Sequence, residues 1–307
     1  LPWTYFVGGA LLSACGVTAQ ALLPLSEDPI IDKRIYGVLH SVAGLVLVLL
    51  GGYRLFEIVM RVCIGLMFAT VVLTAVLIHP EWSAVARGLF LPSIPHAEGA
   101  GLLWTIALMG GVGGTLTVLC YGYWIREEQR EGMQWLPACR IDLGVGYLMT
   151  AVFGIAMVII GSRIQVEGGG AQLVVNLAAE LENVLGPAGK WLFLAGAWGA
   201  VFSSVLGVWQ SVPYVFADFV SITKNEGARE RAERVSTRSR TYRGYLLLLS
   251  TVPCLALFLD FKSVQQYYAA FGALFMPFLA FVLLYLNGSA KRIPAAAKNH
   301  WTTSLIL

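Results

Sequence analysis

Four glycines lie close together in the middle of one apolar stretch, residues 104–124, where the chain could expose backbone atoms to a ligand. The four are Gly110, Gly111, Gly113 and Gly114. Each glycine costs a helix about 1 kcal/mol relative to alanine, so the segment is expected to unwind and to free its carbonyl groups. Thr115 and Thr117 follow at once with hydroxyl groups. Because such oxygens are ligands for hard cations, the pattern predicts a cation site at a helix break.

The same glycines are open to two other interpretations. A helix break also exposes backbone N–H groups, which bind the carboxylate of a small organic solute such as an amino acid. Small residues moreover allow two membrane helices to pack closely, and in that case the protein would be a non-transporting scaffold or sensor. A metal transporter, a carrier of organic solutes and a scaffold are therefore all compatible with this segment alone.

Few ionisable residues fall inside the apolar stretches. Glu57 and Arg61 are four residues apart and can pair on one helix face, with a proton relay as the alternative interpretation. His40 is the only histidine within such a stretch. Asp142 is expected near a helix N-terminus, where the helix dipole favours a carboxylate.

Patterns of enzymatic chemistry are missing from the sequence. There is no H-E-x-x-H motif and no hydrolase triad, and GGVGG at 110–114 is followed by TLT rather than by the GK[ST] of a phosphate-binding loop. The five cysteines form no CxxC pair and predict neither disulfides nor a zinc site. The chain is therefore expected not to be an enzyme, to need no cofactor and, with a small net charge of +3, to bind no nucleic acid.

The composition is that of an integral membrane protein. Of the 307 residues, 57% are hydrophobic and only 13% are charged, whereas soluble domains are roughly 25% charged. The mean hydropathy is +0.72. Since a helix needs about 20 apolar residues to cross a bilayer, the sequence predicts eight spans. They are residues 3–25, 36–52, 55–78, 101–125, 141–162, 189–216, 243–260 and 264–286.

Most lysines and arginines fall in alternate connections between these spans. Because basic residues are retained in the cytoplasm, the loops 126–140 and 217–242 and the C-terminus are predicted to be cytoplasmic. The longer loop contains KNEGARERAERVSTRSR and is expected to be a solvated connector, with contact to lipid headgroups as the alternative. Residues 171–185 carry leucines at four-residue spacing and are predicted to lie as an amphipathic helix along the outer membrane surface.

Residues 1–290 are predicted to form a single transmembrane domain. Residues 291–307 are expected to be a cytoplasmic tail or the start of a further helix. The chain opens with Leu1 and is already apolar at Trp3, so its beginning is expected to be missing.

Four stretches of the sequence carry a resemblance to a known family. They are YRLFEIVMRVCIGLM at 53–67, RIDLGVGYLM at 140–149, LGPAGKWLFLAGAWGAVFSS at 185–204 and KSVQQYYAAFGALFMPF at 262–278. Through them the chain resembles the natural resistance-associated macrophage protein (Nramp) family of proton-coupled divalent metal transporters. The resemblance implies an all-α integral membrane protein of the cell membrane with the LeuT-type inverted-repeat fold. The eight spans would then be the third to tenth helices of that fold.

The resemblance also implies where the metal would bind. The glycine-rich run would be the family's broken sixth helix, in which the carbonyl offered to the metal comes from Gly111. The family's methionine falls on Gly114, its proline on Thr115 and its histidine on Leu116. The expected metal site is therefore Gly111, Gly114 and Thr115, and the expected substrate is a divalent ion of the manganese, iron or magnesium type.

Several departures from the family pattern affect this expectation. A methionine thioether favours soft transition metals, and Gly114 lacks one, so a roomier oxygen site would suit a magnesium-like ion that retains its waters. Residues 1–26 contain no Asp or Glu, although the family's third helix usually carries carboxylates for protons. The sequence therefore does not decide whether metal transport would be coupled to protons. Without the family's first helix and its Asp-Pro-Gly-Asn motif, the 307 residues alone are expected to transport nothing.

Overall fold

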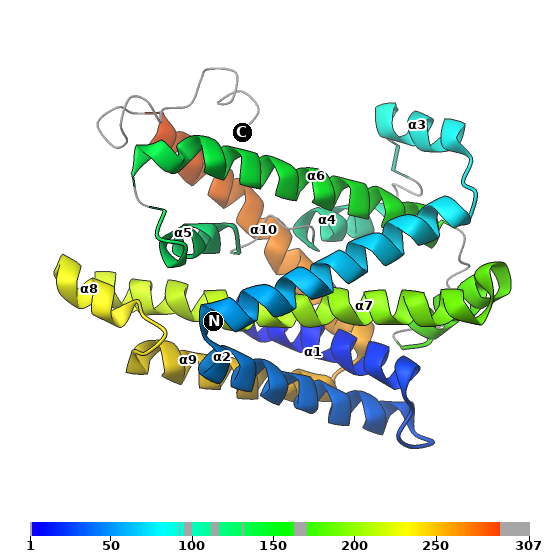
Figure 1. Cartoon of the computed structure of the whole chain (residues 1–307), viewed down its shortest axis with the longest axis horizontal. Helices are drawn as coiled ribbons and strands as arrows, with labels where there is room; N and C mark the ends of the chain where they lie inside the picture. Colours follow the sequence, from blue (N-terminus) through cyan, green and yellow to red (C-terminus); the bar gives the residue numbers. More distant parts are fainter. Residues whose placement is uncertain are drawn as a thin grey trace. The chain divides into compact units, whose positions relative to one another are not determined.

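The computed structural model is built from helices. It describes residues 2–91, 93–94, 100–111, 117–130, 132–162 and 171–288, and these ranges contain no strand. The α-helices (Figure 1) are α1 (Pro2–Leu22), α2 (Pro29–Leu77), α3 (Trp82–Phe90), α4 (Ala100–Gly111), α5 (Thr117–Glu127), α6 (Leu136–Gly161), α7 (Ala171–Thr223), α8 (Ala228–Arg234), α9 (Arg240–Thr251) and α10 (Phe261–Asn287). Two 3-10 helices, η1 (Met133–Trp135) and η2 (Val252–Phe258), precede α6 and follow α9.

Seven helices among the described residues are long and apolar enough to cross a membrane, and they coincide with seven of the eight predicted spans. They are Pro2–Leu22, Pro29–Leu50, Arg54–Leu77, Met133–Gly161, Gly186–Thr223, Arg240–Phe258 and Phe261–Asn287. The remaining predicted span, 101–125, is covered instead by α4 and α5, and residues 112–116 lie outside the described part. The count of eight spans is therefore not confirmed, because only the shorter apolar helix Gly101–Gly110 is found there.

One helical element, α2, covers both the second and the third predicted span. Its 49 residues would extend for about 74 Å, more than twice the thickness of a bilayer core. Figure 1 draws α2 as two rods that meet at an angle, and Gly51 and Gly52 lie between its two apolar halves. The helix begins after Asp28, whose side chain accepts a hydrogen bond from the backbone N–H of Ile30 at 2.8 Å.

The chain divides into two compact units, residues 1–93 with 119–265 and residues 94–118 with 266–307. In the first unit α1 is the most buried helix and packs against α2, α7 and η2. Gly16 permits this close packing, because a Cβ there would collide with the backbone carbonyl oxygen of Lys33 in α2. Small residues in α1 thus bring the helices of this unit together.

The predicted amphipathic helix 171–185 is present as the first part of α7. Gly186 interrupts the element with φ of 72° and ψ of −174°, a left-handed conformation that favours glycine, and separates this helix from the membrane span that follows. Leu181 is buried in a core cluster that includes Val71 of α2 and Ile160 of α6. The helix therefore docks on the first unit through Leu181, and its position on a membrane surface stays a prediction.

The connection predicted at 217–242 is corrected by the structure, because most of it is helical. α7 continues to Thr223, and residues 228–234 form α8. The sequence ARERAER of α8 consists of strong helix formers with opposite charges close enough to support a helix, which explains this local structure. The predicted loop 126–140 is also shorter, since α6 already begins at Leu136. The cytoplasmic side of both connections stays a prediction, and residues 291–307 lie outside the described part.

Candidate functional site

The predicted cation site lies at the end of α4 and in the residues that follow. Gly111 is the last residue of α4, and the next described helix, α5, begins at Thr117. Gly114 and Thr115 lie outside the described residues. Of the glycine-rich run the structure thus describes only Gly110 and Gly111, and the roles of Gly111, Gly114 and Thr115 as ligands stay a prediction.

Gly110 has a packing role that the structure does describe, within the second unit. A Cβ at this position would collide with the backbone carbonyl oxygen of Ala269 and with the backbone nitrogen of Ala273, both in α10. Only a glycine lets α4 and α10 approach this closely. For Gly110, close helix packing is therefore the interpretation that the structure supports.

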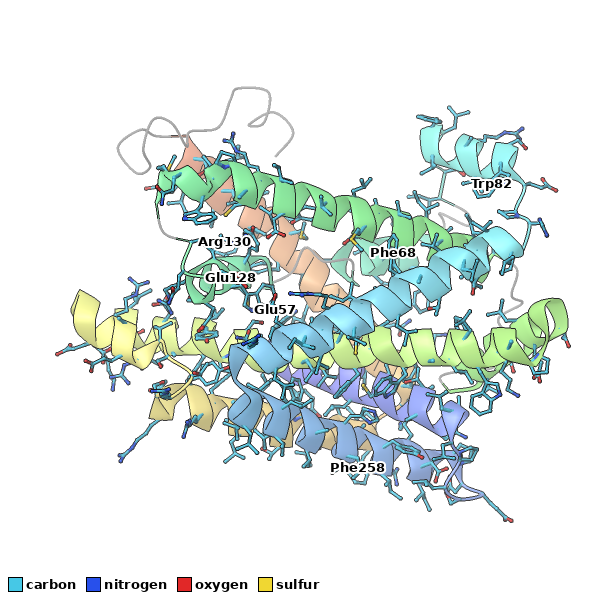
Figure 2. All side chains as sticks on the ribbon, in the orientation of Figure 1. Glu57, Phe68, Trp82, Glu128, Arg130 and Phe258 are labelled. Atoms are coloured by element: carbon cyan, nitrogen blue, oxygen red, sulfur yellow. The ribbon has the colours of Figure 1, made fainter. Side chains whose placement is uncertain are left out.

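A cavity of about 280 Å³ in the first unit gathers charged residues from α2, from α6 and from the segment that follows α5. Glu57, Glu128 and Arg130 lie in the same region of Figure 2, and Asp142 completes the charged part of the lining. An Arg130 guanidinium nitrogen lies 3.8 Å from a carboxylate oxygen of Glu128 and another lies 3.8 Å from one of Asp142. The hydroxyl of Tyr121 donates to Asp142 at 2.8 Å. Among the described residues, no three His, Cys, Asp or Glu side chains converge to hold a metal ion.

Two sequence-based expectations concern residues of this cavity. The predicted i,i+4 pair is confirmed, because the Arg61 guanidinium binds the Glu57 carboxylate. The expectation for Asp142 is corrected: since α6 begins at Leu136, Asp142 lies in its second turn and is held by the Tyr121 hydroxyl. The Asp142 side chain is thus held by a hydrogen bond from another helix rather than by the dipole of its own helix.

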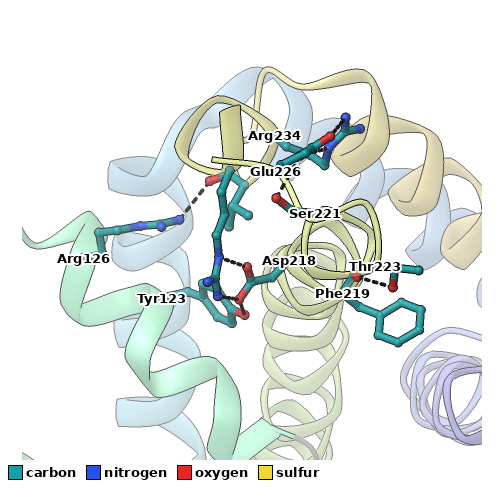
Figure 3. Close-up of polar contacts among 10 residues, drawn as sticks. Tyr123, Arg126, Asp218, Phe219, Ser221, Thr223, Glu226 and Arg234 are labelled. Carbon is teal, nitrogen blue, oxygen red and sulfur yellow. Dashed lines mark hydrogen bonds and ion pairs between the residues drawn. The ribbon is translucent and has the colours of Figure 1, made fainter. Parts of the chain in front are cut away.

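α5 is fastened to α7 and α8 by a charged hydrogen-bond network (Figure 3). Tyr123 donates its hydroxyl to Oδ2 of Asp218 at 2.8 Å. Arg231 donates to both carboxylate oxygens, from Nε to Oδ1 at 2.6 Å and from Nη2 to Oδ2 at 2.9 Å. The Asp218 side chain is only 16% exposed, so its charge is stabilised mainly by these two partners rather than by water.

Three further bonds extend the attachment of α5. They are Trp124 Nε1 to Gln210 Oε1 at 2.6 Å, Arg126 Nη2 to the Val235 carbonyl at 2.8 Å, and a short bond from the Tyr214 hydroxyl to Glu127. The partners are between 86 and 109 residues apart in sequence, so sequence reasoning did not find them. The only signal was the density of aromatic and charged residues in YGYWIREEQR at 121–130.

α8 is itself held by a second ion pair, also drawn in Figure 3. Arg234 Nε donates to Glu226 at 2.6 Å, and the Ser221 hydroxyl donates to the same carboxylate oxygen at 2.8 Å. The hydrogen bond from Arg234 lowers the pKa of Glu226 below its ordinary value. The pair is therefore intact at neutral pH, and its contribution is lost only as the pH falls through that lowered pKa.

His40 forms hydrogen bonds with both of its ring nitrogens. Nε2 accepts from Nε1 of Trp198 at 2.7 Å, so the proton resides on Nδ1, which donates to the Tyr36 carbonyl at 2.7 Å. The ring also meets Phe202 edge-on with centroids 5.4 Å apart. Protonation of Nε2 would break the bond from Trp198, so the geometry favours a structural role for His40 over a proton relay.

Replacing His40 by phenylalanine tests this assignment. The ring is retained, but the Trp198 N–H loses its acceptor, so the free energy of unfolding is expected to fall by about 1–2 kcal/mol. Thermal unfolding in detergent measures this change. The combined loss in H40F with W198F is expected to be smaller than the sum of the single losses. The pH at which the protein is most stable is expected to stay unchanged, and a displaced stability profile would contradict the structural role.

Comparison with known proteins decides the family. The model of the family described as natural resistance-associated macrophage protein-like, Nramp, matches residues 10–307. The chain belongs to the Nramp family. A search of the curated proteins found no match. Nramp proteins are divalent metal transporters with the LeuT fold, so membership confirms the resemblance and supports divalent metal transport as the general function.

The four stretches that resemble Nramp proteins all lie on described helices. Residues 53–67 belong to the second half of α2, 140–149 to α6, and 262–278 to α10, while 185–204 include Gly186 and the start of the span that follows. The Nramp scaffold is thus present in the described part of the chain.

Proposed function

We propose that this chain carries divalent metal cations across the membrane through a site in the segment that joins α4 to α5. Membership of the Nramp family over residues 10–307 is the observation that carries the proposal. Seven membrane-length apolar helices among the described residues supply the setting. The glycine-rich run at 110–114 and Thr115 beside it would supply carbonyl and hydroxyl oxygens as ligands.

In the proposed site Gly111 offers a backbone carbonyl and Thr115 offers a hydroxyl. Gly114 contributes no side chain, so it leaves space for an ion that keeps part of its hydration shell, such as Mg²⁺. Transport follows by alternating access, in which one group of helices rocks against the rest. The separate attachments of the flanking helices suit such a motion, since α4 packs on α10 whereas α5 is bonded to α7 and α8.

Uptake by the complete gene product in proteoliposomes tests the proposal. Mn²⁺, Fe²⁺, Mg²⁺ and Ca²⁺ are offered in turn while the internal pH is recorded. Saturable entry of a divalent metal is expected, and acidification that accompanies entry would identify proton coupling. Entry of no metal by a demonstrably folded protein would contradict the proposal, and competition by amino acids would then favour an organic solute.

Replacing Gly114 by methionine is expected to move the preference toward softer metals. A thioether adds a soft ligand and fills the space reserved for water, so uptake of Mn²⁺ relative to Mg²⁺ is expected to rise about tenfold, the effect of about 1.4 kcal/mol. The ratio is measured in the same liposomes. Gly122→Met is the matched control, because Gly122 lies in α5 and a Cβ there meets nothing within 4 Å. An equal change in both variants, or none in G114M, would show that the site lies elsewhere.

A further inference from the structure

α3 is a short helix with two unlike sides, and its apolar side is exposed. At 3.6 residues per turn, Trp82, Ala86, Leu89 and Phe90 fall within an arc of about 100° around the helix axis. Trp82 is 59% exposed and Phe90 is 83% exposed, and none of the nine residues of α3 is buried. Ala84 lies opposite this arc. α3 is therefore an amphipathic helix whose apolar side has no cover within the described part of the chain.

The remaining apolar side chain of α3, that of Val85, fixes the level at which the helix lies in the first unit. Val85 is partly buried and packs against a core cluster that includes Ala75 and Ile160. These two residues lie within two positions of Leu77 and Gly161, where their membrane spans end. α3 is therefore attached at the level where two spans leave the hydrocarbon core of the bilayer.

The connection between α2 and α3 keeps the helix close to this level. His79 has a φ of 51°, in the left-handed region, and Pro80 follows it, so the chain turns away from the direction of α2. Residues 78–81 alone separate the two helices, and four residues extend for at most about 14 Å. Figure 1 shows α3 directly beyond the end of α2.

We propose that α3 is an interfacial helix that lies on the bilayer surface, with Trp82, Leu89 and Phe90 inserted between the lipid headgroups and the acyl chains. A helix with one apolar side lies in the plane of the interface and buries that side to a depth of about 5–10 Å. Tryptophan is enriched at this level of a membrane. Arg87 lies on the flank of the helix, where its guanidinium can reach lipid phosphates while its stem covers apolar surface.

A protein partner is the other way to cover such a helix face, and the size of α3 argues against it. Stable protein–protein interfaces bury about 800 Å² and about 20–30 residues on each side. α3 has nine residues and offers three large exposed apolar side chains, which is far below that size. The bilayer needs no matching surface and is already present at the level of α3.

The test places a nitroxide label on either side of α3 in the complete protein, reconstituted in phospholipid liposomes and lacking its native cysteines. A86C carries the label on the apolar side, and A84C is the matched probe on the opposite side, since both alanines are exposed. The label in A86C is expected about 5–10 Å below the headgroup boundary, where it collides with oxygen more often than with a water-soluble nickel complex. The label in A84C is expected to show the reverse preference.

Removing the apolar side chains tests whether they hold the helix in the lipid. W82S/L89S/F90S, introduced together with A86C, is expected to move the label from lipid into water. A84S/G88S is the matched control on the opposite side, where a Cβ at residue 88 meets nothing within 4 Å, and is expected to leave the depth unchanged. Because the three replaced side chains are exposed, thermal unfolding in detergent is expected to stay near that of the wild type.

Two results would overturn the proposal directly. Equal collision of both labels with the nickel complex would place the apolar side in water. Protection of the label in A86C from oxygen and nickel alike would show that protein covers it. An unchanged depth in the triple variant would likewise show that these side chains do not anchor α3.

Discussion

Replacing Gly110 by alanine is expected to lower the free energy of unfolding by about 2–3 kcal/mol and to reduce metal uptake strongly. The new methyl group would collide with the Ala269 carbonyl oxygen and the Ala273 nitrogen, and it would lie 3.0 Å from the Ala273 Cα. All three are backbone atoms of α10, so no flexible side chain can move aside. α4 and α10 must therefore separate, and the roughly 1 kcal/mol by which alanine favours a helix offsets only part of this cost.

Thermal unfolding in detergent and uptake in liposomes measure the two consequences. Gly122→Ala and Gly154→Ala are matched controls, because a Cβ at either position meets nothing within 4 Å, and both are expected to be neutral or stabilising. Gly110→Leu is expected to prevent accumulation of folded protein. Wild-type stability of G110A would show that α4 and α10 are not held as closely as described.

Replacing Asp218 by alanine is expected to lower the free energy of unfolding by about 2–4 kcal/mol. It is also expected to release α5 from α7 and α8. Removing one partner of a buried ion pair costs about 3–5 kcal/mol, and the lower estimate applies because the Arg231 side chain is 48% exposed and regains water. The Tyr123 hydroxyl also loses its acceptor. Asp218→Asn keeps the shape of the side chain and one acceptor oxygen, so the free energy of unfolding is expected to fall by less in this variant.

Cys120 reports the release of α5 directly. It lies three residues before Tyr123 and is fully buried. In a background that keeps only this cysteine, D218A is expected to speed labelling by a maleimide reagent. Thr223→Ala is the control, since that exposed hydroxyl bonds only to the Phe219 carbonyl of its own helix at 2.8 Å. Equally fast labelling of the T223A control, or an unchanged labelling rate in D218A, would argue against an anchoring role for Asp218.

The architecture was predictable wherever one physical requirement dominates. A span needs about 20 apolar residues, and that rule found all seven membrane-length helices among the described residues, with ends that differ from the predicted ones by one to eight residues. The rule fails at the connections: α8 was missed because the predicted loop 217–242 was judged by its charge alone. Its helix formers and the pair of Asp218 with Arg231, 13 residues apart, determine that region instead.

The candidate site was predictable only in part. Composition marks the glycine-rich run, but it cannot tell Gly110 from its neighbours, because what separates them is the backbone of α10, which lies far along the chain. The Glu57–Arg61 pair was found because both residues lie on one helix turn. Tyr123 and Asp218 are 95 residues apart, so their bond exists only after the helices have packed.

The packing of α6 has a mechanical consequence. Its buried residues are Ala156, Ile159 and Ile160, all near its C-terminal end, whereas Leu136 lies 24 residues before Ile160, or about 36 Å along the axis. α6 is therefore held at its C-terminal end. A tilt of about 10° about that end would displace the N-terminal end near Leu136 by about 6 Å. Asp142, near that N-terminal end, is bonded to Tyr121, so such a tilt would pull directly on α5.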